Sequence, residues 1–113
     1  MRGTKRQDAI LKAMRFLIPR APLADFAPIL AAATSARMKT LPPPIAAWLS
    51  IIAHVRHVHS PYDALLAEGY ERDAARYFVR DTIDDVLTGW GCQRRLGEHD
   101  DEAGGMSGPE TPR

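Results

Sequence analysis

With 113 residues, 45% of them hydrophobic, and a net charge of +1 at pH 7, the chain is expected to form a single domain with one modest core. Its one cysteine, Cys92, excludes an intramolecular disulfide and a multi-cysteine zinc finger. No signal-peptide cleavage pattern and no run of about 20 apolar residues is present, so the protein is predicted to be cytoplasmic, without a membrane partner.

The N-terminal third of the chain contains two helical patterns. The first helix is predicted to start at Thr4, a capping residue type, and to end before Pro19. Its apolar stripe consists of Ile10, Leu11, Met14, Leu17 and Ile18. A second helix is predicted over residues 23–38. Because a proline disrupts a helix interior, Pro28 requires either that Asp25 caps this helix or that a short turn precedes it.

Two further helices are predicted between a proline connector and a glycine. The connector, residues 41–43, cannot be helical because each proline disfavours helical geometry in the residue before it. The third helix, 44–59, has apolar residues on most sides and is expected to be the most buried element. A short fourth helix is predicted to open at Ser60-Pro61 and to end at Gly69 in the left-handed conformation.

The clearest helical pattern predicts a fifth helix over 72–90. Its apolar side contains Ala75, Phe78, Val79, Thr82, Ile83, Val86, Leu87 and Trp90. Residues 98–113 are rich in glycine, proline and acid and form a predicted disordered tail. The sequence therefore predicts an all-α fold: a flexible N-terminus at 1–3, then a single small helical bundle of about five helices over 4–97. Trp48 and Trp90 are predicted to anchor its core.

Conspicuous residues are spread over roughly positions 23–95. They are Leu41, Pro42, Pro43, Trp48, His54, Arg56, His57, His59, Tyr62, Asp63, Leu66, Gly69, Tyr70, Arg72, Asp73, Ala75, Arg76, Trp90 and Gly91. This pattern resembles a family of uncharacterised, mostly bacterial proteins, the domain of unknown function 2293. The family has no established activity, so the resemblance does not imply a function.

The histidines at the end of the third helix are candidate metal ligands. His54 and His57, three residues apart, share a helix face, and His59 lies just beyond, near Asp63. Imidazoles in a last turn are also favoured by the helix dipole, and this structural interpretation is preferred. The sequence therefore predicts no metal and no cofactor. It also contains no nucleophile elbow or phosphate-binding glycine loop, which makes an enzyme, including a metal-dependent one, the less favoured alternative.

The segment from Glu68 to Ala75 is similar to the glycine-aromatic loop of ubiquitin-associated-like three-helix modules, in which the loop and the last helix bind another protein. Those modules are shorter, and their final helix is not as long as the one predicted here. The simpler interpretation is structural: Gly69 provides a positive φ angle, and Tyr70 fills the core.

Nucleic-acid binding is the main alternative function, because charge is unevenly distributed. Residues 1–60 carry nine Lys or Arg against two acids, whereas 61–97 carry five against seven. The candidate residues are Lys5, Arg6, Lys12, Arg15, Arg20, Arg37 and Lys39. A helix-turn-helix that uses the fifth helix is disfavoured because phosphates would repel its aspartates.

The leading hypothesis is a non-enzymatic macromolecular interaction module with an unknown protein partner. Its predicted surface consists of the polar residues that cluster between structural helices: His54, Arg56, His57, His59, Tyr62, Asp63, Arg72 and Arg76.

Overall fold

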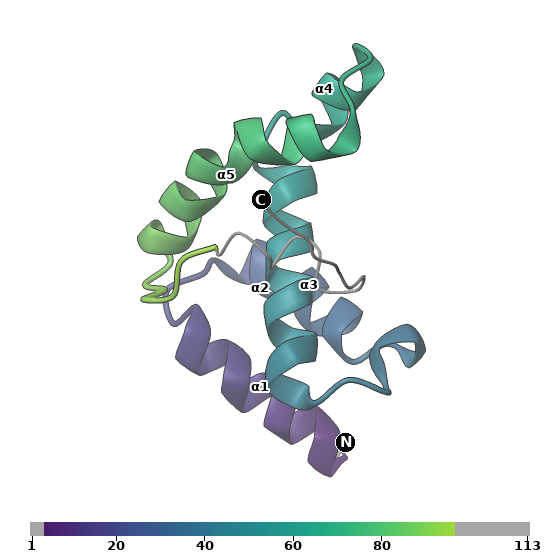
Figure 1. Ribbon diagram of the computed structural model, residues 1–113. Coiled ribbons are helices and arrows are strands. Elements are labelled where there is room, and N and C mark those ends of the chain that lie inside the picture. Colours follow the sequence, from purple (N-terminus) through teal and green to yellow (C-terminus); the bar gives the residue numbers. More distant parts are fainter. Residues whose placement is uncertain (1–3, 97–113) are drawn as a thin grey trace, which may run out of the picture.

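The computed structural model describes residues 4–96, and every regular element in this range is helical (Figure 1). The elements in chain order are α1 (Lys5–Leu17), α2 (Leu23–Ala33), the 3-10 helix η1 (Ala36–Met38), α3 (Pro43–Val58), α4 (Tyr62–Ala67) and α5 (Arg72–Gly89). The predicted all-α fold with five α-helices is confirmed. The predicted flexible N-terminus, 1–3, and disordered tail, 98–113, lie outside the described residues.

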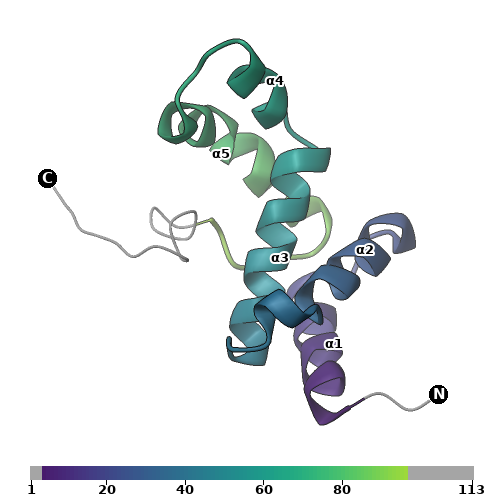
Figure 2. The ribbon, with the colours of Figure 1, turned by 90° about the vertical axis from the view of Figure 1, so that its right-hand side faces the viewer.

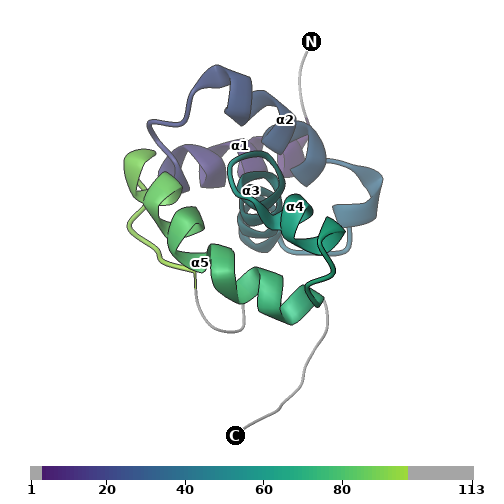
Figure 3. The ribbon, with the colours of Figure 1, turned by 90° about the horizontal axis from the view of Figure 1, so that it is seen from above.

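Helix α3 passes through the middle of the molecule. Figure 2 shows α1 and α2 beside its first half and α4 and α5 at its other end, and Figure 3 shows α3 end-on between these two groups. Its buried residues are Ala46, Ala47, Trp48, Ser50, Ile51, Ile52, Val55 and Arg56. This burial confirms that the helix with apolar residues on most sides is the central one.

Both tryptophans lie in the core, as predicted. The exposed fraction of Trp48 is 2% and that of Trp90 is 8%. The guanidinium carbon of Arg94 lies 4.1 Å from the ring centroid of Trp48, a distance at which a cation and an aromatic face attract each other. Residues that follow α5 therefore return to cover the central helix.

The predicted start of α1 is confirmed in detail. The Gln7 backbone N–H donates to Thr4 Oγ1 at 3.0 Å, and the Thr4 N–H donates to Gln7 Oε1 at 2.9 Å. This reciprocal pair is a capping box, which satisfies two otherwise free donors of the first turn. The buried side of α1 is centred on Ile10 and Met14, which are fully buried.

The predicted helix over 23–38 is too long. Helix α2 ends at Ala33, because the hydroxyl groups that follow bond to the carbonyls of its last turn. Thr34 Oγ1 donates to the Leu30 carbonyl at 2.8 Å, and Ser35 Oγ donates to the Ala32 carbonyl at 2.7 Å. Such side chains compete with the backbone and favour helix ends. The chain then continues as η1.

Neither predicted position of Pro28 is correct. The N-cap of α2 is Pro22, and Asp25 lies in the first turn instead of capping it. Pro28 is thus inside the helix, where it lacks the N–H that would bond the carbonyl of Ala24. Pro28 and Ala24 are both exposed to solvent, which makes this missing bond less costly than it would be in the core.

The boundaries around α3 and α4 differ from prediction by about one residue. Helix α3 begins at Pro43 and ends at Val58, and α4 begins at Tyr62 with Pro61 as its N-cap. The prediction of Ser60 as the cap is wrong: it lies one residue before the N-cap, although its Oγ accepts a hydrogen bond from the Tyr62 N–H at 3.2 Å. Helix α5 matches its predicted range to within one residue. Within residues 4–96 no helix is long and apolar enough to cross a membrane.

Two glycines end helices with positive φ angles, and their substitution by alanine should have unequal effects. Gly69 (φ 102°) has open space where a Cβ would stand, whereas at Gly91 (φ 87°) a Cβ would lie 2.9 Å from Pro19 Cγ. We expect Gly69→Ala to lower the free energy of unfolding by about 1 to 2 kcal/mol through backbone strain alone, and Gly91→Ala to lower it further. Urea denaturation of both variants measures this difference. Equal losses would contradict the packing of Gly91 against Pro19.

Candidate functional site

The structure does not present all eight residues of the predicted interaction surface to solvent. Arg56 is only 7% exposed and Tyr62 only 4%. The Arg56 guanidinium carbon lies 5.5 Å from the ring centroid of Tyr62, so this pair fastens α4 to the end of α3. Both residues belong to the interior, which corrects their prediction as surface-binding groups.

His57 and Asp63 form an exposed pair between α3 and α4. His57 Nδ1 and Asp63 Oδ1 are 2.8 Å apart, and the two side chains are 50% and 61% exposed. The imidazole also contacts the Tyr62 ring edge to face, at a centroid distance of 5.4 Å. Because the pair is so exposed, its ionic contribution to stability is at most small.

His54 and His59 meet a residue that the sequence interpretation did not place with them, Asp25 in the first turn of α2. Asp25 Oδ1 lies 2.8 Å from His54 Nε2 and 2.6 Å from His59 Nε2. The exposed fractions of the side chains are 13% for Asp25, 14% for His54 and 34% for His59. The three candidate metal-ligating histidines therefore do not meet at one place: His54 and His59 share Asp25, and His57 pairs with Asp63.

The three groups are electrostatically coupled. Desolvation raises the pKa of the Asp25 carboxyl, but the hydrogen bonds from His59 and His54, together with their positive charge, outweigh it, so the pKa falls below its usual value. An ionised carboxylate can only accept hydrogen bonds. Both imidazoles must therefore donate their Nε2–H to the same oxygen.

The two arginines of the predicted surface lie at the start of α5. Arg72 is exposed at the first helical position, and Arg76, one turn later, is partly buried.

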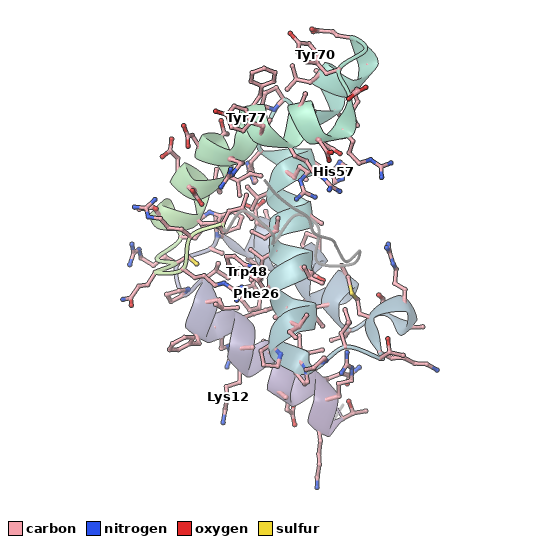
Figure 4. The ribbon with its side chains drawn as sticks, in the orientation of Figure 1. Lys12, Phe26, Trp48, His57, Tyr70 and Tyr77 are labelled. Atoms are coloured by element: carbon pink, nitrogen blue, oxygen red, sulfur yellow. The ribbon has the colours of Figure 1, made fainter. Side chains whose placement is uncertain are left out.

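The residues predicted to bind nucleic acid are mostly exposed, with one exception. Arg6 donates from Nη1 to the Leu41 carbonyl at 2.7 Å and from Nη2 to the Met38 carbonyl at 2.6 Å, so it attaches α1 to the end of η1 and to the segment after it. The exposed members are Lys5, Lys12, Arg15, Arg20, Arg37 and Lys39. Lys12 projects from α1, away from the α4–α5 end (Figure 4).

A cluster of exposed aromatic side chains was not predicted from the sequence. Tyr70, Tyr77 and Phe78 are 43%, 68% and 58% exposed, respectively, and we call them the aromatic surface. The ring centroids of Tyr70 and Phe78 are 5.6 Å apart and those of Tyr77 and Phe78 are 5.9 Å apart, both edge to face. Tyr70 and Phe78 were predicted to lie in the core, so their exposure is a correction. Tyr70 and Tyr77 lie at the α4–α5 end of the molecule (Figure 4).

The exposure of Phe78 follows from the narrow buried stripe of α5. The fully buried residues Ala75, Val79 and Ile83 follow one another at intervals of four. Successive residues of a helix are rotated by about 100°, so Phe78 and Tyr77 lie to one side of this stripe.

Cys92 has the properties of a structural cysteine. It is 8% exposed, and its thiol donates to the Arg94 carbonyl at 3.2 Å. Burial raises the pKa of the Cys92 thiol, which disfavours the nucleophilic thiolate. This residue therefore offers no support for cysteine-based catalysis.

The fold and these surfaces define a small all-α domain built around one central helix. The chain belongs to the family described as uncharacterized conserved protein (DUF2293), whose model matches residues 13–91. The resemblance inferred from sequence is thus confirmed, but the match begins inside α1, earlier than the predicted position 23. No curated protein and no solved structure matches the chain. Family membership supplies no activity, so function must be argued from the geometry.

Proposed function

We propose that this protein is a non-enzymatic interaction module that binds a protein partner through the aromatic surface. The observation that carries the proposal is the mutual contact of Tyr70, Tyr77 and Phe78 while each remains more than 40% exposed. Fully burying an apolar side chain of this size contributes roughly 1.5 to 3 kcal/mol, and the isolated chain gains only part of it because these rings remain partly exposed. A partner that covers the rings would gain the remainder.

The arrangement of the rings suits recognition. Edge-to-face contacts restrict the orientation of each ring, so less side-chain entropy is lost when a partner binds. Tyrosine and phenylalanine are enriched in protein interfaces, and tyrosine is among the residues that contribute most to binding energy. The tyrosine hydroxyls add polar groups that can align a partner.

The charge around the rings defines the kind of partner. Residues 62–91 carry seven acids against three arginines, a net charge of −4. A hollow beside Tyr77 and Phe78 is also lined by Arg80, Asp81 and Asp84. Net negative charge in this part of the chain, next to an apolar centre, favours a segment that combines Lys or Arg with large apolar residues, and repels phosphates. The proposed partner is therefore a basic, partly apolar protein segment.

A selection from a random peptide library tests this proposal. We expect selection on the wild-type protein to enrich peptides that contain both basic and large apolar residues. The double variant Tyr77→Ser/Phe78→Ser should bind them at least about tenfold more weakly, because two well-covered rings contribute more than 1.4 kcal/mol. Affinities are measured by fluorescence polarisation with a selected peptide.

Phe16→Ser is the matched control. Phe16 is an aromatic residue on α1 that is 83% exposed, and its loss should leave peptide affinity unchanged. Equal weakening by both variants, or no weakening by the double variant, would refute the assignment of the surface. Urea denaturation must show that each variant remains folded, which is expected because all three positions are exposed.

Nucleic acid is tested separately, with single-stranded RNA and duplex DNA at about 50 mM salt. Because phosphate contacts release counterions, such binding would weaken steeply as salt rises. One result would refute the proposed function: salt-dependent binding that is lost in the double variant Lys12→Glu/Arg15→Glu but kept in Tyr77→Ser/Phe78→Ser. The protein would then bind nucleic acid through the basic N-terminal half of the chain.

A further inference from the structure

Three potential metal ligands, from α2, from α3 and from the C-cap of α3, lie close together. The Oδ1 atom of Asp25 and the Nε2 atoms of His54 and His59 all lie within 4.8 Å of one another. Asp25 is 29 residues from His54 and 34 residues from His59, so the packing of α2 against α3 creates the cluster. It shares no residue with the aromatic surface, so a role for this cluster is independent of the proposed function.

We propose that Asp25, His54 and His59 bind a divalent transition-metal ion of the zinc type. Two imidazoles and one carboxylate are a ligand set that Zn²⁺ and Co²⁺ accept, whereas Ca²⁺ and Mg²⁺ require oxygen ligands throughout. Three protein ligands leave at least one coordination position for water or for a group from a bound molecule.

The three ligand atoms, which lie within 4.8 Å of one another, must rearrange to hold an ion. Metal–ligand distances of about 2.0 to 2.2 Å in a tetrahedral site place neighbouring ligand atoms about 3.3 Å apart. The two hydrogen-bonded separations here are 2.8 and 2.6 Å. Binding replaces the two Nε2–H protons with the ion and moves each imidazole away from the carboxylate by about half an ångström. The protons are released to solvent, as metal binding to imidazole requires.

The position of His59 allows this movement and provides access. His59 is the C-cap of α3, beyond the regular helix, and its side chain is 34% exposed. Asp25 and His54, in contrast, are held inside helices and are nearly buried. The cluster therefore combines two fixed ligands with one that can close over an entering ion.

The aromatic neighbour of His59 offers an independent signal. The ring centroids of His59 and Trp90 are 5.7 Å apart. A paramagnetic ion bound at His59 should therefore quench the fluorescence of Trp90.

The test uses the full chain without a histidine tag, first dialysed against a chelator. Titration with Co²⁺ is followed by visible absorption and tryptophan fluorescence, and titration with Zn²⁺ by calorimetry. We expect one ion per chain. Asp25→Asn and His54→Gln should each weaken binding at least about tenfold. His57→Gln is the matched control, because it removes a histidine of the same helix that pairs with Asp63, and it should leave the affinity unchanged.

Absence of stoichiometric binding, or equal loss in His57→Gln and His54→Gln, would overturn the proposal. If circular dichroism shows that Asp25→Asn or His54→Gln is unfolded, metal affinity is measured on His59→Gln instead. This variant is expected to fold because His59 is partly exposed and lies outside the regular helices. Binding by folded His59→Gln with wild-type affinity would also overturn it. Loss of metal binding leaves the peptide affinity of the aromatic surface intact, so failure of one proposal is distinguishable from failure of the other.

Discussion

Replacement of Trp48 by alanine should lower the free energy of unfolding by about 3 to 5 kcal/mol, the usual cost of removing a large buried aromatic side chain. Trp48 is 2% exposed in the first half of α3, and Arg94 packs on its ring. The variant loses this packing and leaves a cavity. Because small domains are stable by only about 5 to 15 kcal/mol, it should unfold at a much lower urea concentration.

Phe16→Ala is the control for this measurement. Phe16 is 83% exposed on α1, so its removal should change the free energy of unfolding by no more than about 0.5 kcal/mol. Similar losses in the two variants would contradict the central position of α3 and Trp48.

Replacement of Arg56 by alanine is expected to lower the free energy of unfolding by about 2 kcal/mol, the order of a desolvated cation–π contact. Arg56 is 7% exposed and lies over the buried Tyr62 ring, so it supports α4 rather than a partner. Urea denaturation measures the loss. Arg72→Ala, at an exposed position, should leave stability nearly unchanged.

Unchanged stability together with weaker peptide binding would show instead that Arg56 is a binding residue. In that case Arg56→Ala would weaken peptide binding by tenfold or more while the urea midpoint stayed at its wild-type value. Peptide affinity and urea denaturation of the same preparation therefore separate the two roles.

The helices could be predicted because their apolar residues recur at helical spacing. Apolar groups around most of α3 indicated that other helices surround it, and the proline connector and Gly69 marked interruptions correctly. The two tryptophans were also placed correctly, since both fall on apolar stripes. These are local patterns, which a single sequence contains directly.

The errors in α2 also have local causes, but competing ones. Alanines favour continuation of the helix beyond Ala33, whereas Thr34 and Ser35 bond back to carbonyls of its last turn and end it. Pro28 was expected near the helix start, yet the helix interior tolerates the missing hydrogen bond because Pro28 and Ala24 lie on its exposed side. Helix propensity alone does not decide whether the helix continues past Ala33 or ends there.

The candidate sites depend on contacts between distant segments, so the sequence indicated them only in part. His54 and His59 were recognised, but their shared partner Asp25 comes from a helix near the N-terminus. Tyr70 and Phe78 have apolar side chains at core-like spacing. Whether they are buried depends on which helices cover α5, and no neighbouring segment of residues 4–96 covers them fully.

The most direct test of the proposed function is an amide NMR titration of the labelled protein with a selected basic, apolar peptide. We predict that the largest shift changes occur at Tyr70, Tyr77 and Phe78 and at their neighbours in α5, while the amides of α1 remain unchanged. Shift changes confined to α1 and the segment around η1 would contradict the aromatic surface as the binding site.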